Sequence, residues 1–287
     1  MLLSIPLKTT RRLDIGAPLA HWVDKTHPYY RSEHCKKDLV RLTSIRNCLS
    51  ESINTAHAHH AALEDRALED CMEYHACLLE AENRGFPTMD DALVGATELR
   101  LSWNCAFAEE NPIVRSNIRY ERACVLFNVA ALLSYKAATE DHRSSKEGRT
   151  RAMKLYGRSA ATFRHLRTEL MEGPSADPDP SADLTEPFLL MCESLLRAQG
   201  QICAYEAGRS RPEPMPALVS KLAAGAADLY DEALSHSQDR IVKAKCPEAA
   251  SGWGGHLKAM SYLFRARAEV HASEAHRAGR QWGAEVA

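Results

Sequence analysis

The stretch 118–137 constrains the fold more than any other part of the sequence. Its apolar residues recur at helical spacing and cover most of a helix, so this helix must be surrounded by protein on most sides. These residues are Ile118, Cys124, Leu126, Phe127, Val129, Ala130, Ala131, Leu133 and Ala137. Asn128 stands within the apolar face, and an unpaired buried amide costs about 1–3 kcal/mol, so we expect a neighbouring group to hold it. The stretch therefore predicts the central helix of an all-helical core.

Helical periodicity continues through most of the chain. We expect helices at about 32–49, 55–84, 114–140, 146–170, 184–207, 215–236 and 255–280. The apolar segment Leu2–Leu7 contains Pro6, which suits an edge strand or an extended arm, and Leu99–Trp103 also favours a strand. The pattern predicts a mostly α-helical single domain over residues 1–287, an elongated and curved structure. Its core would be antiparallel helices like those of tetratricopeptide proteins, with a minor N-terminal β element.

Composition excludes several classes of function. The 287 residues carry a formal net charge of -2, which gives no overall attraction to nucleic acid. The longest apolar run, Cys124–Leu133, is about half as long as a membrane-spanning helix, and Lys8 is reached before any signal-peptide core forms. Nine cysteines without a C-x-x-C pair predict reduced thiols. We expect a cytoplasmic protein without cofactor or metal.

Several sequence pieces together resemble one known family. The run Tyr-Glu-Arg-Ala-Cys-Val-Leu-Phe-Asn-Val-Ala-Ala-Leu, which begins at Tyr120, closely resembles the central helix of the Bro domain of ALIX-type endosomal adaptors. Further pieces, in the order found in that family, are Leu3–Lys8, Leu101–Phe107, Ser159–Phe163, Leu196–Gln201, Ser220–Leu222, Trp253, Lys258, Tyr262 and Trp282–Ala287. The resemblance implies a Bro-like domain that is C-terminally short, because Gln281–Ala287 resembles a point before the last helices of the family's domain.

The resemblance also implies a binding site. In Bro domains, the face that corresponds to Pro216–Leu222 lines an apolar patch that receives the C-terminal amphipathic helix of an ESCRT-III subunit. It therefore implies that Leu218 and Leu222 bind such a helix, while Lys221 pairs with acidic residues of the partner. Ala204, followed by Tyr205, stands where the family patch has an aromatic residue, and losing that anchor weakens binding by around 2 kcal/mol. Judged from the residues alone, two leucines four apart are more often part of a core.

A basic run extends over the predicted helix 146–170 and the loop before it. It consists of Arg143, Lys146, Arg149, Arg151, Lys154, Arg158, Arg164 and Arg167. A solvated helix face explains such a run. The alternative is docking on an acidic partner or on anionic endosomal membrane, where each cation contributes about 1 kcal/mol.

Two patterns resemble enzyme or metal motifs. His34 and Cys35, with Arg41 further on, have the spacing of cysteine phosphatases, but no glycine lies between them and the helical pattern continues. Zinc-ligand residue types occur at His57, His59, His60, Cys71, His75 and Cys77, at spacings that fit helix faces better than a zinc site. Three functions remain open. They are a non-enzymatic adaptor recruited to endosomes for multivesicular-body sorting, a generic tetratricopeptide-like peptide-binding scaffold, and a cysteine-dependent phosphatase.

Overall fold

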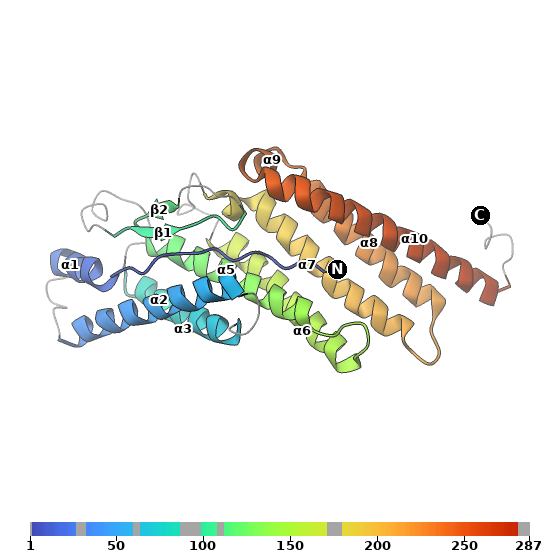
Figure 1. Cartoon of the computed structure of the whole chain (residues 1–287), viewed down its shortest axis with the longest axis horizontal. Coiled ribbons are helices and arrows are strands. Elements are labelled where there is room, and N and C mark those ends of the chain that lie inside the picture. The colour runs from blue at the N-terminus through green and yellow to red at the C-terminus, as the bar shows by residue number, and fades with distance from the viewer. Residues whose placement is uncertain are drawn as a thin grey trace. The chain divides into compact units, whose positions relative to one another are not determined.

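The computed structural model describes residues 2–26, 33–59, 64–86, 99–107, 112–170 and 180–280. Helices dominate these ranges, which confirms the predicted fold class (Figure 1). The α-helices are α1 (Gly16–Thr26), α2 (Glu33–His59), α3 (Glu64–Asn83), α5 (Ile118–Thr139), α6 (Lys146–His165), α7 (Glu186–Arg209), α8 (Pro216–Ser237), α9 (Arg240–Lys245) and α10 (Gly254–Ala278). Two antiparallel strands, β1 (Leu101–Trp103) and β2 (Ile113–Arg115), form a small hairpin in which Ser102 faces Val114.

The chain folds as two compact units. The first contains Met1–Ile5, Leu133–Arg164 and Thr185–Ala287, and the second contains Pro6–Leu132 and His165–Leu184. The loop expected at 172–181 falls within the second of these units, and its residues 171–179 lie outside the described ranges. That residues 1–287 form a single domain stays a prediction.

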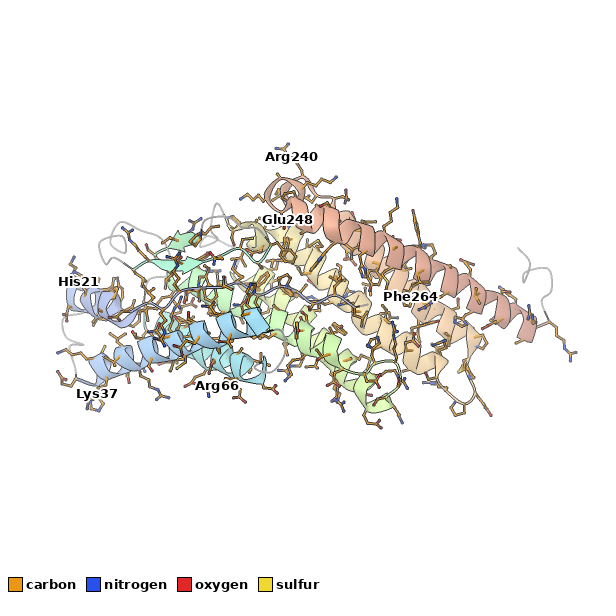
Figure 2. The ribbon with its side chains drawn as sticks, in the orientation of Figure 1. His21, Lys37, Arg66, Arg240, Glu248 and Phe264 are labelled. Atoms are coloured by element: carbon orange, nitrogen blue, oxygen red, sulfur yellow. The ribbon has the colours of Figure 1, made fainter. Side chains whose placement is uncertain are left out.

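In the second unit, α1 and α3 both pack against α2. Asp14 caps α1, because its Oδ1 accepts hydrogen bonds from the backbone N–H groups of Gly16 and Ala17 at 3.0 and 3.1 Å. The helices α2 and α3 run antiparallel, and an exposed ion pair of 3.7 Å joins Arg41 to Glu73. The labels of His21, Lys37 and Arg66 in Figure 2 mark α1, α2 and α3.

Two buried polar side chains in this unit, Glu121 and Asn128, have several hydrogen-bond partners. The carboxylate of Glu121 on α5 accepts hydrogen bonds from Arg46 Nε at 3.1 Å, Tyr74 Oη at 3.1 Å and Trp103 Nε1 at 2.6 Å. Asn128 holds the extended N-terminal segment, because its Oδ1 accepts from the backbone N–H of Lys8 and its Nδ2 donates to the backbone oxygen of Lys8. These distances are 2.8 and 2.9 Å, so the expectation that a neighbouring group holds Asn128 is confirmed.

In the first unit, α8 packs against both α7 and α10 (Figure 1). Small residues on the inner face of α8 allow this close approach, and they are Ala223, Ala226, Ala227 and Ala233. Between the helices the rings of Tyr205, Tyr230 and Phe264 are buried. Gln199 on α7 pairs with the backbone of Leu3, and Ser134 Oγ accepts from the backbone N–H of Ile5 at 2.9 Å. Leu2–Leu7 is therefore an extended arm, one of the two forms expected.

The structure corrects the prediction at three helices. The break expected at 50–54 is wrong, because α2 continues to His59 with Leu49 and Ile53 fully buried. The short helices α1 and α9 were not expected, although Asp14 and Asp239 cap them as N-terminal signals of this kind do. The strand favoured near Leu99–Trp103 is confirmed as β1.

Candidate partner-binding site

The start of α8 presents two leucines to the outside. Val219 and Ala223 are buried against neighbouring helices, whereas Leu218 and Leu222 are half-buried. Residues four apart lie on one face of a helix, so the two leucines form a partly exposed apolar edge. Gly225, seven positions after Leu218, continues the same face and is also half-buried. The leucines are thus only partly used by the fold.

The facing side of α7 supplies small and polar residues. Gln201 Nε2 donates to the backbone oxygen of Leu222 at 3.2 Å. A methyl group on Gly208 would lie 3.1 Å from Leu222 Cδ1, so the two helices approach closely there. Ala204 lies between Gln201 and Gly208 on this face and is half-buried. We call the surface made by Gln201, Ala204, Leu218, Leu222 and Gly225 the α7–α8 strip.

Tyr205 lies behind the strip rather than on it. Its side chain is 2% exposed, and its ring meets the ring of Phe264 edge-on at a centroid distance of 5.4 Å. Tyr205 Oη lies 3.1 Å from His271 Nε2, and burial raises the pKa of Tyr205. The consecutive residues Ala204 and Tyr205 therefore differ in role. Tyr205 packs α7 against α10, whereas Ala204 lies half-buried on the face of α7 that carries Gln201 and Gly208.

Charged groups flank the strip. Lys221 is exposed one position before Leu222. Arg197 Nη1 lies 3.8 Å from Glu232 Oε2 with both side chains 44% exposed, so this pair adds little stability. Arg164 of α6 pairs more closely with Glu193 of α7, at 2.6 Å. Lys221, which is exposed, and Arg197, whose ion pair with Glu232 is weak, are therefore both able to pair with an acidic side chain of a partner.

The basic run is partly neutralised within the protein. Arg151 binds Glu140 through Nε and Nη2 at 2.8–3.0 Å, and these hydrogen bonds hold the pKa of Glu140 below its usual value. Arg164 is engaged by Glu193. Within the described ranges, Lys154 and Arg158 on α6 have no acidic partner and are exposed. Both side chains are therefore available to contact another surface.

The phosphatase-like residues lie on a helix. Cys35 and Arg41 belong to the first turns of α2 and line a cavity of 1060 Å³ with residues of α1 and α3. The backbone between them is helical, so it does not form the loop of N–H groups that a phosphatase wraps around phosphate. Arg41 instead contacts Glu73.

The zinc-type residues are dispersed in the part of the chain that the structure describes. His57 is exposed, Cys71 is fully buried and burial raises its thiol pKa, while His60 lies outside the described residues. No three metal-ligand side chains come together in the described ranges. The nine cysteines, all within the described ranges, form no disulfide. Among the described helices, none is both long and apolar enough to cross a membrane.

Sequence reasoning did not identify Gln201, Gly208 and Gly225 as parts of the site. Gln201 belongs to Leu196–Gln201, which carried part of the family resemblance, but its contact with Leu222 depends on how α7 and α8 align. The two glycines gave a weaker signal, since glycine inside a helix usually needs a packing reason. Gly208 has one, because the side chain of Leu222 occupies the adjacent space.

Comparisons with known proteins agree with this architecture. A family model described as BRO1-like domain matches residues 2–287. Programmed cell death 6-interacting protein of Xenopus laevis is 26% identical over 292 residues, covering 99% of this chain and 31% of that protein. Vacuolar-sorting protein BRO1 of Arabidopsis thaliana is 26% identical over 280 residues, covering 96% and 31% respectively. The chain thus spans about a third of the length of these relatives.

Solved structures show the same fold. The ALIX BRO1 domain in its complex with CHMP4C matches with a TM-score of 0.80 at 23% identity, covering 100% of this chain and 76% of the other. A Bro1 domain whose structure addresses endosomal targeting matches with a TM-score of 0.71 at 15% identity, covering 98% and 72%. At these identities the likeness establishes the helical fold.

Proposed function

Because this chain belongs to the BRO1-like domain family, we propose that it is an adaptor domain that binds the C-terminal amphipathic helix of an ESCRT-III subunit. The proposed contact surface is the α7–α8 strip, with Leu218 and Leu222 as apolar anchors, Ala204 beside them and Lys221 at the edge. Tyr205 supports the strip from behind. The domain would act without catalysis, in multivesicular-body sorting.

One observation carries this proposal. Leu218 and Leu222 are only half-buried on α8, although Val219 and Ala223, on the same two turns, are buried. An amphipathic helix laid along the strip would cover both leucines and place its acidic side chains near Lys221 and Arg197. The complex of the ALIX BRO1 domain with CHMP4C, an ESCRT-III subunit, supports this choice of partner.

The test uses single substitutions on α8. Leu218→Asp and Leu222→Asp should each weaken capture of an ESCRT-III C-terminal peptide by about a hundredfold or more, since an apolar contact is lost and a carboxylate is desolvated. The far-UV circular dichroism and melting temperature should change little. Ala217→Asp is the matched control, because it adds the same charge to the same helix at an exposed position outside the strip. Wild-type affinity in a folded Leu218→Asp variant would remove the proposal.

Recruitment to endosomes follows from the same proposal, with the domain arriving from the cytoplasm. Lys154 and Arg158 offer an additional contact with anionic endosomal membrane, because both are exposed and without an acidic partner in the described ranges. Replacing both by alanine should reduce flotation with phosphatidylserine vesicles while leaving peptide capture unchanged. Equal flotation of the double variant would show that α6 does not contribute to membrane contact.

Two other functions predict different results. A generic tetratricopeptide-like scaffold would bind unrelated amphipathic peptides as well as the ESCRT-III helix. A cysteine phosphatase would hydrolyse an aryl phosphate and lose that activity in Cys35→Ser. The helical backbone between Cys35 and Arg41 argues against this second alternative.

A further inference from the structure

A cavity of 360 Å³ lies on a different face of α7 from the strip. It is formed by α7, α10, the N-terminal arm and the loop between α5 and α6. Its apolar lining consists of Leu2, Ile202, Met260, Leu263 and Phe264, and Figure 2 marks Phe264 partway along α10. On α7 the cavity uses Ile202, Glu206 and Arg209, whereas the strip uses Gln201 and Ala204. The two surfaces are therefore separate.

The cavity has an excess of positive charge. Arg143, Arg209 and Arg267 line it, with Glu206 as the acidic residue and His142 beside them. Arg209 Nη2 lies 2.9 Å from Glu206 Oε2, so these two charges largely offset each other. Arg143 and Arg267 have no acidic partner within the described residues. Two arginines therefore remain to attract an anion.

The rings around Arg267 orient its guanidinium group. Its central carbon lies 4.9 Å from the ring centroid of Phe264 and 5.7 Å from that of Tyr205. Cation–π contacts of this kind hold a guanidinium beside aromatic rings without using its N–H groups as hydrogen-bond donors, so these groups stay able to bind a carboxylate. Leu263, on the same helix, is 43% exposed at the side of the cavity. A cation and an apolar surface are thus presented together.

We propose that this cavity binds an acidic peptide segment in which a carboxylate side chain lies next to a large apolar side chain. The carboxylate binds Arg267 and Arg143. The apolar side chain packs on Leu263, Met260 and the rest of the apolar lining. Inorganic phosphate or a lipid headgroup would use only the arginines and leave the apolar lining in contact with water. The volume is at the lower end of the range for ligand sites, about 300–1,000 Å³, which suits a short segment rather than a whole helix.

Fluorescence anisotropy with a fluorescein-labelled Glu-Leu-Glu-Leu-Glu-Leu peptide tests the proposal. Arg143→Met and Arg267→Met should each weaken binding about tenfold, as expected for losing one charge-assisted hydrogen bond. Leu263→Asp should abolish it. Arg211→Met is the matched control, since it removes an exposed arginine outside the cavity, and Leu218→Asp on the strip should also leave binding unchanged.

Several results would overturn the proposal. One is equal binding of the peptide to wild type and to a folded Arg143→Met, Arg267→Met double variant. Another is equal affinity for a Glu-Ser-Glu-Ser-Glu-Ser peptide, which would reduce the cavity to a simple anion site. Displacement of the peptide by millimolar inorganic phosphate, or by phosphatidylserine vesicles that no longer bind the double variant, would assign the arginines to phosphate or to membrane instead.

Discussion

Lys8 and Asp183 form a fully buried ion pair in which Lys8 Nζ lies 2.7 and 2.6 Å from the two carboxylate oxygens. Asp183 also accepts hydrogen bonds from Ser181 Oγ and from the backbone N–H of Ala106, each at 2.7 Å. The lysine thus neutralises a carboxylate whose other hydrogen bonds come from uncharged groups. A buried charge is tolerated only when it is paired in this way.

Removing this lysine should destabilise the protein strongly. In Lys8→Met, a chain of similar length fills the space but Asp183 keeps an uncompensated buried charge, so we expect a loss of about 3–5 kcal/mol in the free energy of unfolding. Urea denaturation measures the loss. Lys25→Met, at an exposed position, is the control and should change stability by less than about 0.5 kcal/mol. A small effect at Lys8 would mean that Asp183 is already protonated.

The same pair sets a pH dependence. Burial alone would raise the pKa of Asp183, but Lys8 and the hydrogen bonds to Asp183 outweigh burial, and its pKa lies below the ordinary value. Burial likewise acts to lower the pKa of Lys8, yet Asp183 raises it overall. The contribution of Asp183 to the free energy of unfolding is therefore present above its unfolded pKa of about 3.9. It is lost as pH falls through the lower pKa of the folded state. The contribution of Lys8 is present below its unfolded pKa of about 10.4 and is lost as pH rises through the raised pKa of the folded state.

In Lys8→Met, stability should rise rather than fall as the solution is made more acidic. Without the lysine, burial acts on Asp183 with less opposition and its pKa rises, so protonation relieves the buried charge. The stability difference between wild type and Lys8→Met should consequently narrow as pH is lowered from 8 to 5. Melting temperatures of both proteins across this range provide the measurement. A constant difference would contradict the assignment.

Glu121→Gln should disrupt a second buried ion pair, the one between Arg46 and Glu121. Arg46 and Glu121 are both fully buried, and the substitution leaves the Arg46 charge without its carboxylate, at a cost of about 3–5 kcal/mol. A double-mutant cycle with Arg46→Met, followed by urea denaturation, should show that the double variant loses less than the two single variants combined. Glu147→Gln, at an exposed position of α6, is the control. Additive losses would mean that the two residues act independently.

Two glycines in helices should respond oppositely to alanine. Gly157 on α6 is exposed with open space around its Cα, so Gly157→Ala should stabilise the protein by roughly 0.5–1 kcal/mol. At Gly208 the new methyl group would lie 3.1 Å from Leu222 Cδ1, so Gly208→Ala should displace Leu222 and offset that gain. Thermal melts compare the two variants. Peptide capture should fall only in Gly208→Ala, and an equal effect of both would argue against the strip.

Ala204→Phe should tighten binding of the ESCRT-III helix. The residue is half-buried on the face of α7 that carries Gln201 and Gly208, so a ring there should extend the apolar surface of the strip. An aromatic anchor of about 2 kcal/mol corresponds to roughly thirtyfold in affinity. Isothermal titration measures the gain, and Ala207→Phe, at an exposed position of α7 outside the strip, controls for added hydrophobicity. Weaker binding of Ala204→Phe would mean that the partner helix needs the space left by alanine.

The long helices were predictable because their apolar residues recur over many turns. This holds for α5, α7, α8 and α10, whose observed ends lie close to the expected ones. The polar sequence around Ser50 looked like a break, but Ser50 Oγ donates to the backbone oxygen of Thr10 from inside α2. A helix of 11 residues such as α1 offers few turns for a periodic pattern, so its cap at Asp14 was the main available signal.

The candidate site was predictable only in part. Spacing placed Leu218 and Leu222 on one face of a helix, but the extent of their burial depends on how α7 aligns with α8. The contact between Gln201 and Leu222 reflects that alignment, which periodicity does not encode. Ala204 and Tyr205 are adjacent in sequence, yet helix geometry turns one outward and the other toward Phe264.

The separation of Lys8 from Asp183 has a consequence for biosynthesis. Ribosomes add about 5–20 residues per second, and 175 positions separate the two residues, so Lys8 is synthesised roughly 9–35 seconds before its partner. During that interval Lys8 has no carboxylate to pair with, so the N-terminal segment cannot be buried. It should remain accessible to chaperones on the nascent chain. This unit can therefore be completed only after Asp183 has been synthesised, and nascent fragments that stop before Asp183 should be readily degraded.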